Sequence, residues 1–360
     1  MSTELLFSPI QLGRIVLSSR IVMSPMTRNR ALGNVPNELM ARYYGQRAEA
    51  GLIVTEGTSP SPDGLGYARI PGLFNDAQVR GWRLVTDAVH REGGRIFVQL
   101  MHTGRVSHPA NLPAGARVIA PSALALGGGI WVDPDGEKAA PVPEAMSAAD
   151  IERTIGEYAR SCELAIHAGF DGVELHAANG YLLEQFLNTA TNLRTDRWGA
   201  SGSIEDRLRF VIEVARRSAA RIGGDRVGIR VSPYGTFNGT TSDAATEDVY
   251  EALAKELSSI GLVYLHVVDH SAMGAPAVPK SIKEKVRAAF RGKLILSGGY
   301  DRARAEADVR EGRADLIAFG RPFISNPRLV TRLRANAPLR AADQATFYSS
   351  GEKGYTDYPA

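Results

Sequence analysis

The sequence predicts a (β/α)8 TIM barrel, because short apolar runs alternate with helical patterns along the chain. Eight such runs are each followed by a stretch of helical periodicity, which is typical of parallel strands joined by right-handed crossovers. Eight units favour a closed barrel over an open doubly wound sheet. The runs are apolar throughout, as expected for strands covered on both faces. No G-x-G-x-x-G motif follows a strand, which weighs against a Rossmann-type nucleotide site.

Each expected strand precedes an expected helix. The strands are residues 21–26, 52–57, 95–100, 172–176, 227–231, 263–268, 293–296 and 316–319. The helices are residues 37–50, 76–91, 147–168, 203–221, 246–259, 279–290, 301–311 and 326–335. Ser147 and Asp150, three residues apart, predict a capping arrangement at the start of the third helix. A weakly alternating segment, residues 11–18, predicts a small N-terminal hairpin ahead of the barrel.

A long segment, residues 101–146, interrupts this alternation of strands and helices after the third strand. It holds six prolines, and its Asp133-Pro134-Asp135-Gly136 turn predicts a local hairpin. A loop of this length inside a compact domain is usually a lid or binding element, whereas a linker to a second domain is the competing interpretation. Because the alternation of strands and helices resumes afterwards, we expect an inserted lid loop within one domain spanning residues 1–360. The tail, residues 341–360, has no clear periodicity.

Composition excludes several classes of partner. The chain has 360 residues, 44% hydrophobic and 22% charged, with a formal net charge of +3 and no long Lys/Arg run, so no nucleic-acid partner is expected. The single cysteine, Cys162, permits neither an intrachain disulfide nor a thiolate metal cluster. No apolar run approaches the ~20 residues that a membrane span needs. We therefore expect a cytoplasmic protein without a membrane partner.

The C-terminal ends of the expected strands, where barrel enzymes concentrate their function, are unusually polar here. The fourth strand is followed by His176, Asn179 and Tyr181. This spacing offers two hydrogen-bond donors and a phenol, which suits binding one oxygen and delivering one proton. A histidine packed in the core is the competing interpretation for His176.

Glycines after the last two strands point to a phosphate. Gly298 and Gly299 follow the seventh strand, and Gly320 and Arg321 follow the eighth, where barrels commonly hold a phosphate group. Arg321 adds a charge able to pair with it. The alternative is that these glycines only turn the chain. A glycine pair together with Gly-Arg at these two strands favours the phosphate.

Several other strand-end residues suit a planar heterocycle. Gln99 both donates and accepts in one plane, and Arg230 is costly to bury without an anionic partner. Thr27 supplies a hydroxyl, while Pro25 and Gly57 allow close backbone approach. Singly, each has a simpler explanation: Thr27 as a loop cap, Gln99 as a backbone contact, and Arg230 as a partner of Glu174. Together, opposite a phosphate site, they fit flavin mononucleotide (FMN).

Other chemistries fit the sequence less well than a flavin does. None of the seven lysines lies near the C-terminal end of a strand, so a Schiff-base barrel is not expected. A metal-dependent barrel hydrolase is the alternative, and its candidate ligands are His102, His108, His176, His270, Asp269 and Glu56. A metal leaves the glycines without a role. A non-catalytic binding barrel accounts for the phosphate site but not for Tyr181.

The chain resembles the Old Yellow Enzyme family. The motifs that carry the resemblance are residues 25–28, 98–100, 176–182, 192–199 and 354–359, in the family's order over essentially the whole chain. The family consists of FMN-containing barrels that use NADPH or NADH to reduce activated alkenes such as α,β-unsaturated carbonyls, maleimides and nitroalkenes. The resemblance implies non-covalent FMN, a small-molecule substrate, and a monomer or homodimer.

Carried over by position, the resemblance implies roles for individual residues. Those implied to contact the cofactor are Pro25, Met26, Thr27, Gly57, Gln99, His176, Arg230, Gly298, Gly299, Gly320 and Arg321. Those implied to line the substrate pocket are Tyr67, Met101, His176, Asn179, Phe237 and Tyr348, the last placing the tail near the active site. His176 and Asn179 would bind the substrate's oxygen. Tyr181 would protonate Cα after hydride passes from flavin N5 to Cβ.

The chain also departs from many members of that family. Met101 stands where many relatives have Trp, so the pocket is expected to accept bulkier substrates or another binding orientation. Thr27, rather than Cys, places the chain in the Thr-type branch. Ser349 and Ser350 replace frequent glycines near Tyr348, which puts the shape of the tail there in doubt.

Overall fold

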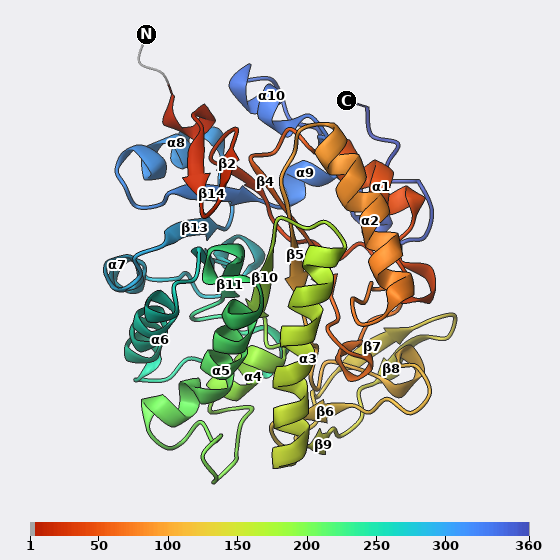
Figure 1. The fold of residues 1–360 in the computed structure, drawn as a ribbon, viewed down its shortest axis with the longest axis vertical. Coiled ribbons are helices and arrows are strands. Elements are labelled where there is room, and N and C mark those ends of the chain that lie inside the picture. Colours follow the sequence, from red (N-terminus) through yellow and green to blue (C-terminus); the bar gives the residue numbers. More distant parts are fainter. Residues whose placement is uncertain (1–3, 360) are drawn as a thin grey trace.

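Eight parallel strands form a closed barrel, which confirms the predicted fold class (Figure 1). The computed structural model describes residues 4–359. The barrel strands follow in the chain as β3 (Ile21–Met23), β4 (Leu52–Thr58), β5 (Ile96–Leu100), β10 (Gly172–Ala177), β11 (Val227–Val231), β12 (Tyr264–Val268), β13 (Lys293–Ser297) and β14 (Leu316–Phe319). Each pairs with its sequence neighbour, and β14 closes the barrel against β3.

Helices surround the barrel, as Figure 1 shows. They are α1 (Glu38–Gly45), α2 (Asp76–Arg91), α3 (Ala148–His167), α4 (Leu182–Leu187), α5 (Ile204–Ile222), α6 (Thr246–Ile260), α7 (Lys280–Ala289), α8 (Arg302–Arg310), α9 (Arg321–Ser325) and α10 (Leu329–Arg334). The predicted capping box at Ser147 and Asp150 is confirmed. Within residues 4–359, no helix has both the length and the apolar character required to traverse a lipid bilayer.

Four differences from the expected elements are local. The first strand ends at Met23 rather than at residue 26, because Pro25 has no N–H to continue the ladder. The expected helix 326–335 is found as the shorter α10, Leu329–Arg334, because Pro327 disfavours helical backbone at Asn326, whose φ and ψ are −128° and 84°. The short helix α9, which precedes it, was not expected. The helix α4, directly after Tyr181, was not expected.

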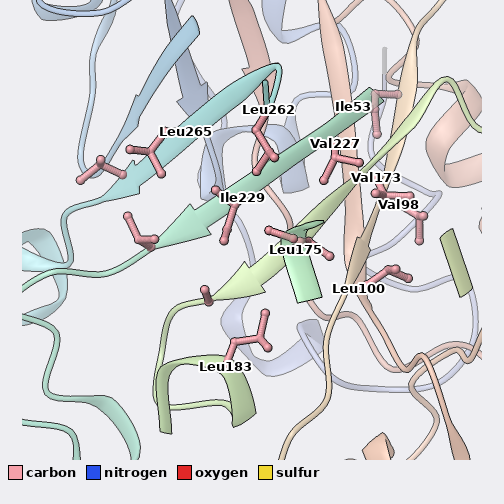
Figure 2. Close-up of a cluster of buried hydrophobic side chains, with 14 of the residues drawn as sticks. Ile53, Val98, Leu100, Val173, Leu175, Leu183, Val227, Ile229, Leu262 and Leu265 are labelled. Carbon is pink, nitrogen blue, oxygen red and sulfur yellow. The ribbon is translucent and has the colours of Figure 1, made fainter. Parts of the chain in front are cut away.

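Alternation along β10 separates an apolar outer face from polar side chains that face the barrel interior. In β10, the side chains of Val173, Leu175 and Ala177 join the main hydrophobic cluster, which lies between the barrel and its helices (Figure 2). Successive side chains of a strand point to opposite faces, so Glu174 and His176 face the barrel interior. All residues of β10 are buried. Burial on both sides explains why the runs look apolar in the sequence while still presenting polar groups inward.

A hairpin and an insertion lie at opposite ends of the barrel (Figure 1). The predicted N-terminal hairpin is confirmed as β1 (Ile10–Leu12) and β2 (Ile15–Leu17), which pack against interior residues of the barrel strands. In the insertion, β6 (Ile119–Ala120) pairs with β9 (Glu144–Ala145), and the predicted hairpin is β7 (Gly129–Val132) with β8 (Gly136–Ala139). The insertion's lid role, the single domain spanning residues 1–360 and the cytoplasmic location stay predictions.

Candidate active site

The turn after β10 holds Asn179 through its backbone and its side chain. Its φ of 61° lies in the left-handed region, which Asn tolerates better than most residues. The Asn179 N–H donates to Ser232 Oγ at 2.8 Å, and its carbonyl accepts from Asn238 Nδ2 at 2.7 Å. Asn179 Oδ1 lies 2.7 Å from His270 Nε2. The two main-chain contacts fix the backbone of Asn179, and the contact with His270 occupies its side-chain oxygen. The side-chain NH2 group is left as a donor for a ligand.

His176 lies on the interior face of β10, just before this turn. It is 3% exposed, and its Nδ1 is buried without a hydrogen-bond partner within residues 4–359. Burial, together with the nearby Arg230 charge, lowers the pKa of His176 well below its usual value. The ring is therefore neutral at physiological pH and has one N–H to donate. A buried polar atom without a partner at a strand end is what a ligand site presents before the ligand binds.

Tyr181 stands next to both residues. Its ring is 5.0 Å from the His176 ring, centroid to centroid, and its hydroxyl is 3.1 Å from the Tyr67 hydroxyl. Burial raises the pKa of Tyr181 above its ordinary value of 10.0. The phenol is therefore protonated throughout the neutral range and is suited to give a proton rather than to take one.

A hydrogen-bonded network fills the barrel interior below these groups. Gln99 Nε2 donates to Glu174 Oε1 at 2.8 Å, and Tyr264 donates to Glu174 Oε2 at 3.1 Å. His266 bridges Glu174 at 2.9 Å and the Ser297 hydroxyl at 2.9 Å. Burial would raise the pKa of Glu174, but His266, Arg230 and Gln99 hold it below its usual value, so the carboxyl is ionised. Glu174 therefore fixes the orientation of the Gln99 side-chain amide. The carbonyl oxygen of that amide accepts no hydrogen bond within this network.

Arg230, on the interior face of β11, is a buried cation without a direct anionic partner. It is 6% exposed, and its register places it beside His176. Within residues 4–359, its Nε has no hydrogen-bond partner and no carboxylate lies within ion-pair distance of the guanidinium. The alternative pairing of Arg230 with Glu174 is thus not found, because Glu174 contacts His266 instead. Such a cation requires an electron-rich ligand to offset its burial.

The predicted phosphate-site glycines lie on neighbouring strand ends. Gly298 and Gly299 follow β13, and Gly320 follows β14, which pairs with β13. Gly298 has a φ of 130°, and a Cβ there would lie 2.1 Å from the Asp269 carbonyl oxygen, so only glycine fits. Arg321 is exposed at the start of α9. The structure brings these residues to one region of the rim, and their phosphate role stays a prediction.

The residues expected from strands one and two lie on the same rim. Pro25 is buried, while Met26 and Thr27 are half-buried. A Cβ on Gly320 would lie 3.7 Å from Met26 Sδ, so the end of the first strand adjoins that of the eighth. A Cβ on Gly57 would lie 2.5 Å from Met101 Sδ, so a side chain at this position would displace the Met101 side chain.

The expected substrate-lining residues are not equally accessible. Met101 is 1% exposed and packs in a small cluster that includes Tyr67 and Tyr181. Its effect on pocket size stays a prediction. Phe237 is half-buried, with its ring 4.7 Å from that of His270, and Tyr348 is 61% exposed.

Buried arginines hold the tail that carries Tyr348 beside the rim. Arg28 donates to the carbonyls of Phe347 at 3.0 Å and Gly354 at 2.7 Å. Arg30 donates to the carbonyls of Thr346 and Phe347 at 2.9 and 2.8 Å. The tail, which was predicted to lie near the active site, is thus held by two arginines that follow Thr27 in the chain.

Several neighbours of the site were not identified from the sequence. Those that support the β10 turn or the rim are Glu184, Ser232, Asn238, Glu174 and His266, together with Arg69, which bonds the carbonyls of Asn29 and Tyr348. Their contacts join residues far apart in the chain, which no local motif reveals. The metal alternative gains no support, since residues 4–359 contain no group of three or more His, Cys, Asp or Glu side chains able to hold an ion.

Comparison with known proteins identifies the family of this chain. The model for the NADH:flavin oxidoreductase / NADH oxidase family matches residues 5–340. The chain belongs to this family. A probable flavin mononucleotide-dependent alkene reductase from Leishmania infantum is 40% identical over 363 residues, which cover 99% of this chain and 98% of that protein.

Solved structures of the family share the whole fold. Morphinone reductase matches with a TM-score of 0.95 at 44% identity, covering 99% of this chain and 96% of that chain. The old yellow enzyme homologue from Zymomonas mobilis matches with a TM-score of 0.94 at 40% identity, covering 99% of both chains. These likenesses confirm the resemblance to the Old Yellow Enzyme family. Assignment to its Thr-type branch stays a prediction.

Proposed function

We propose that this protein is an FMN-dependent ene-reductase, which uses NADPH or NADH to reduce the C=C bond of activated alkenes. The single observation that supports this most is the set at the end of β10: a neutral His176, an Asn179 amide with a free NH2 group, and a protonated Tyr181. A probable FMN-dependent alkene reductase among the relatives supports the same reaction class.

The donor set fits FMN. The unpaired, buried Arg230 suits the electron-rich pyrimidine edge, and Gln99 offers an amide carbonyl held in plane by Glu174. Gly298, Gly299, Gly320 and Arg321 would hold the phosphate, while Thr27 and the backbone of Pro25, Met26 and Gly57 would contact the ring. When bound there, FMN would supply the hydride-transfer chemistry between the nicotinamide and the alkene.

The residues of the chain perform the rest of the reaction. His176 and Asn179 donate hydrogen bonds to the carbonyl or nitro oxygen of the substrate, on which negative charge grows as the Cβ–H bond forms. Donors fixed at that oxygen stabilise the transition state more than the ground state. Tyr181 then gives its proton to Cα, and the adjacent Tyr67 hydroxyl stabilises the phenolate that remains. Tyr67, Met101, Phe237 and Tyr348 would bound the substrate.

An absorption spectrum of the purified protein tests the proposal. We expect a flavin band that NADPH or NADH bleaches anaerobically and that 2-cyclohexenone restores. The same experiment with each nicotinamide would establish the preferred reductant. A colourless protein, or a flavin band that reoxidises only with oxygen, would contradict the proposed function.

A further inference from the structure

Glu184 lies directly beneath the turn that carries Asn179, and its carboxyl receives three hydrogen bonds. Glu184 belongs to α4, the short helix that begins after Tyr181, and it is 2% exposed. Its Oε2 accepts from the Gly180 N–H at 2.6 Å. Its Oε1 accepts from the Ser232 hydroxyl at 2.7 Å and from the Tyr250 hydroxyl at 3.1 Å. The hydrogen bonds therefore come from three separate segments of the chain.

Ser232 connects the Glu184 carboxyl to the turn that carries Asn179. While it donates to Glu184, its Oγ accepts the Asn179 N–H at 2.8 Å. Asn179 and Gly180 have consecutive positive φ angles of 61° and 72°, which direct both of their N–H groups inward, toward these two acceptors. A Cβ on Gly180 would lie 2.5 Å from the Phe237 carbonyl oxygen, so the turn has little room to relax. Glu184 and Ser232 thus stabilise a backbone conformation that the sequence alone would not favour.

The ionised form of Glu184 matches these partners. A carboxylate only accepts hydrogen bonds, and all three of its contacts are with donors. A protonated carboxyl would have to donate to Ser232 or Tyr250, and at least one of these hydroxyls would then lose its present acceptor. Protonation would therefore loosen the link from Glu184 through Ser232 to the Asn179 backbone.

The surroundings of Glu184 are buried and, within residues 4–359, place no cationic side chain within ion-pair distance of its carboxyl. An adjacent cavity of about 10 Å³, lined among others by Ser232, Tyr234 and Tyr250, has room for about one water molecule. Besides Glu184, the charged residue that lines the cavity is Arg207 of α5, which forms an ion pair with Asp243 at 3.0 Å. Burial raises the pKa of Glu184 to about 7, against the opposing effect of its three donors.

We propose that ionised Glu184, acting through Ser232, is the positioning residue of the substrate-oxygen site. It holds the Asn179–Gly180 turn so that the Asn179 amide and the Tyr181 hydroxyl are both directed at the substrate. Glu184 touches neither substrate nor cofactor. The inference rests on the proposed function, because it assigns Glu184 to the alkene-binding side of the same site.

The test compares wild type with Glu184→Gln in steady-state reduction of 2-cyclohexenone between pH 6 and 8.5. Displacing a substrate-binding group by a fraction of an ångström to 1 Å costs up to about 100-fold, so at pH 8 we expect kcat/KM to fall by roughly 10- to 100-fold. In wild type, kcat/KM should decline as pH falls through about 7, and Glu184→Gln should lack this inflection. FMN content should stay at the wild-type level.

Two further variants keep the test decisive if Glu184→Gln folds poorly. Ser232→Ala should also lower kcat/KM, and adding Glu184→Gln to it should cause a less than additive further loss, because the two residues share the connection to the Asn179 N–H while Glu184 alone also holds the Gly180 N–H. Tyr250→Phe removes one donor from the carboxylate without touching the turn. It should move the inflection to higher pH and preserve the rate at high pH, a response that a purely structural role does not predict.

The possible failures are distinguishable. Wild-type protein that binds FMN but does not reduce 2-cyclohexenone would overturn the proposed function together with this inference. Active wild type alongside a Glu184→Gln variant with unchanged kcat/KM and an unchanged pH profile would overturn the inference alone. Additive losses in the Ser232→Ala double variant would likewise contradict a shared connection.

Discussion

Tyr181 differs from the other polar residues of the β10 turn because it is the one with a proton to give at neutral pH. His176 is neutral and Asn179 does not titrate, so both contribute through fixed N–H groups. Burial keeps the Tyr181 hydroxyl protonated, and the only side chain that bonds its oxygen within residues 4–359 is Tyr67. In the proposed reaction, binding of the oxygen and delivery of the proton are therefore assigned to different residues.

This separation predicts an asymmetric effect of Tyr181→Phe. General acid catalysis contributes roughly 10²- to 10⁴-fold, so we expect the rate of alkene reduction to fall by about that factor. Reduction of the flavin by NADPH needs no such proton and should stay within about twofold of wild type. Anaerobic stopped-flow measurement of each half-reaction checks both statements.

A comparison variant separates the loss of the Tyr181 proton from the loss of the neighbouring hydroxyl. Tyr67→Phe keeps the proton on Tyr181 and removes only the neighbouring hydroxyl at 3.1 Å, so its effect on alkene reduction should be smaller. Equal losses in both half-reactions of Tyr181→Phe would show that the residue acts in binding rather than as the proton donor.

At the scale of elements, the C-terminal tail depends on arginines that follow the first strand. Arg30 is 2% exposed and reaches the carbonyls of Thr346, Phe347 and Lys353. Its guanidinium lies 4.7 Å from the Tyr355 ring centroid. Burial and the neighbouring Arg28 lower the pKa of Arg30 to about 10, so it still carries its charge at neutral pH. One short segment thus joins the predicted flavin contact at Thr27 to the tail.

We expect Arg30→Met to release the tail while the barrel stays folded. Each buried carbonyl left without a donor costs about 1–3 kcal/mol, so opening of residues 346–355 should become easier by roughly 2–4 kcal/mol. Hydrogen exchange of the Tyr355 and Thr356 amides measures this. The control is Arg42→Met, which removes an exposed ion pair with Glu352 and should change the opening by less than about 1 kcal/mol. Similar exchange in both variants would contradict the arginine anchor.

The elements also show what local sequence can and cannot predict. Barrel strands and both hairpins were predictable, because apolar runs and turn residues act over a few positions. Pro327 was visible in the sequence, but the helix expected from residue 326 begins only at Leu329, and the short helix α9 before it was missed. The support from Glu184 and Ser232 could not be predicted, since residues 48 positions apart meet only once β10 and β11 pair. The polar strand ends were therefore predictable as a set, but the contacts that orient them were not.

At the scale of the whole molecule, the two ends of the barrel differ in polarity. The β1–β2 hairpin covers one end with apolar side chains, whereas the polar interior groups Gln99, Glu174 and Arg230 lie toward the other. Near the polar end the barrel also buries Glu56 and Glu184, whose pKa values burial raises to about 7. Carboxyls of this kind reduce stability when they ionise, so the proposed site carries a cost that depends on pH.

Glu56 allows this cost to be measured away from the proposed catalytic groups. It is fully buried in β4 and accepts hydrogen bonds from the Arg28 N–H and the Tyr44 hydroxyl, both at 3.3 Å. Because burial raises its folded-state pKa from 4.5 to about 7, its contribution to stability is fully present below pH 4.5 and is lost as pH rises through about 7. A shift of this size corresponds to about 3 kcal/mol.

Glu56→Gln should therefore change the pH dependence of unfolding. Between pH 4.5 and 8, the unfolding free energy of wild type should fall by about 3 kcal/mol relative to that of Glu56→Gln, as measured by urea denaturation. Glu205→Gln, at a side chain that is 83% exposed, controls for the loss of one negative charge. A constant difference between wild type and Glu56→Gln over this range would show that Glu56 ionises as readily in the folded barrel as in the unfolded chain.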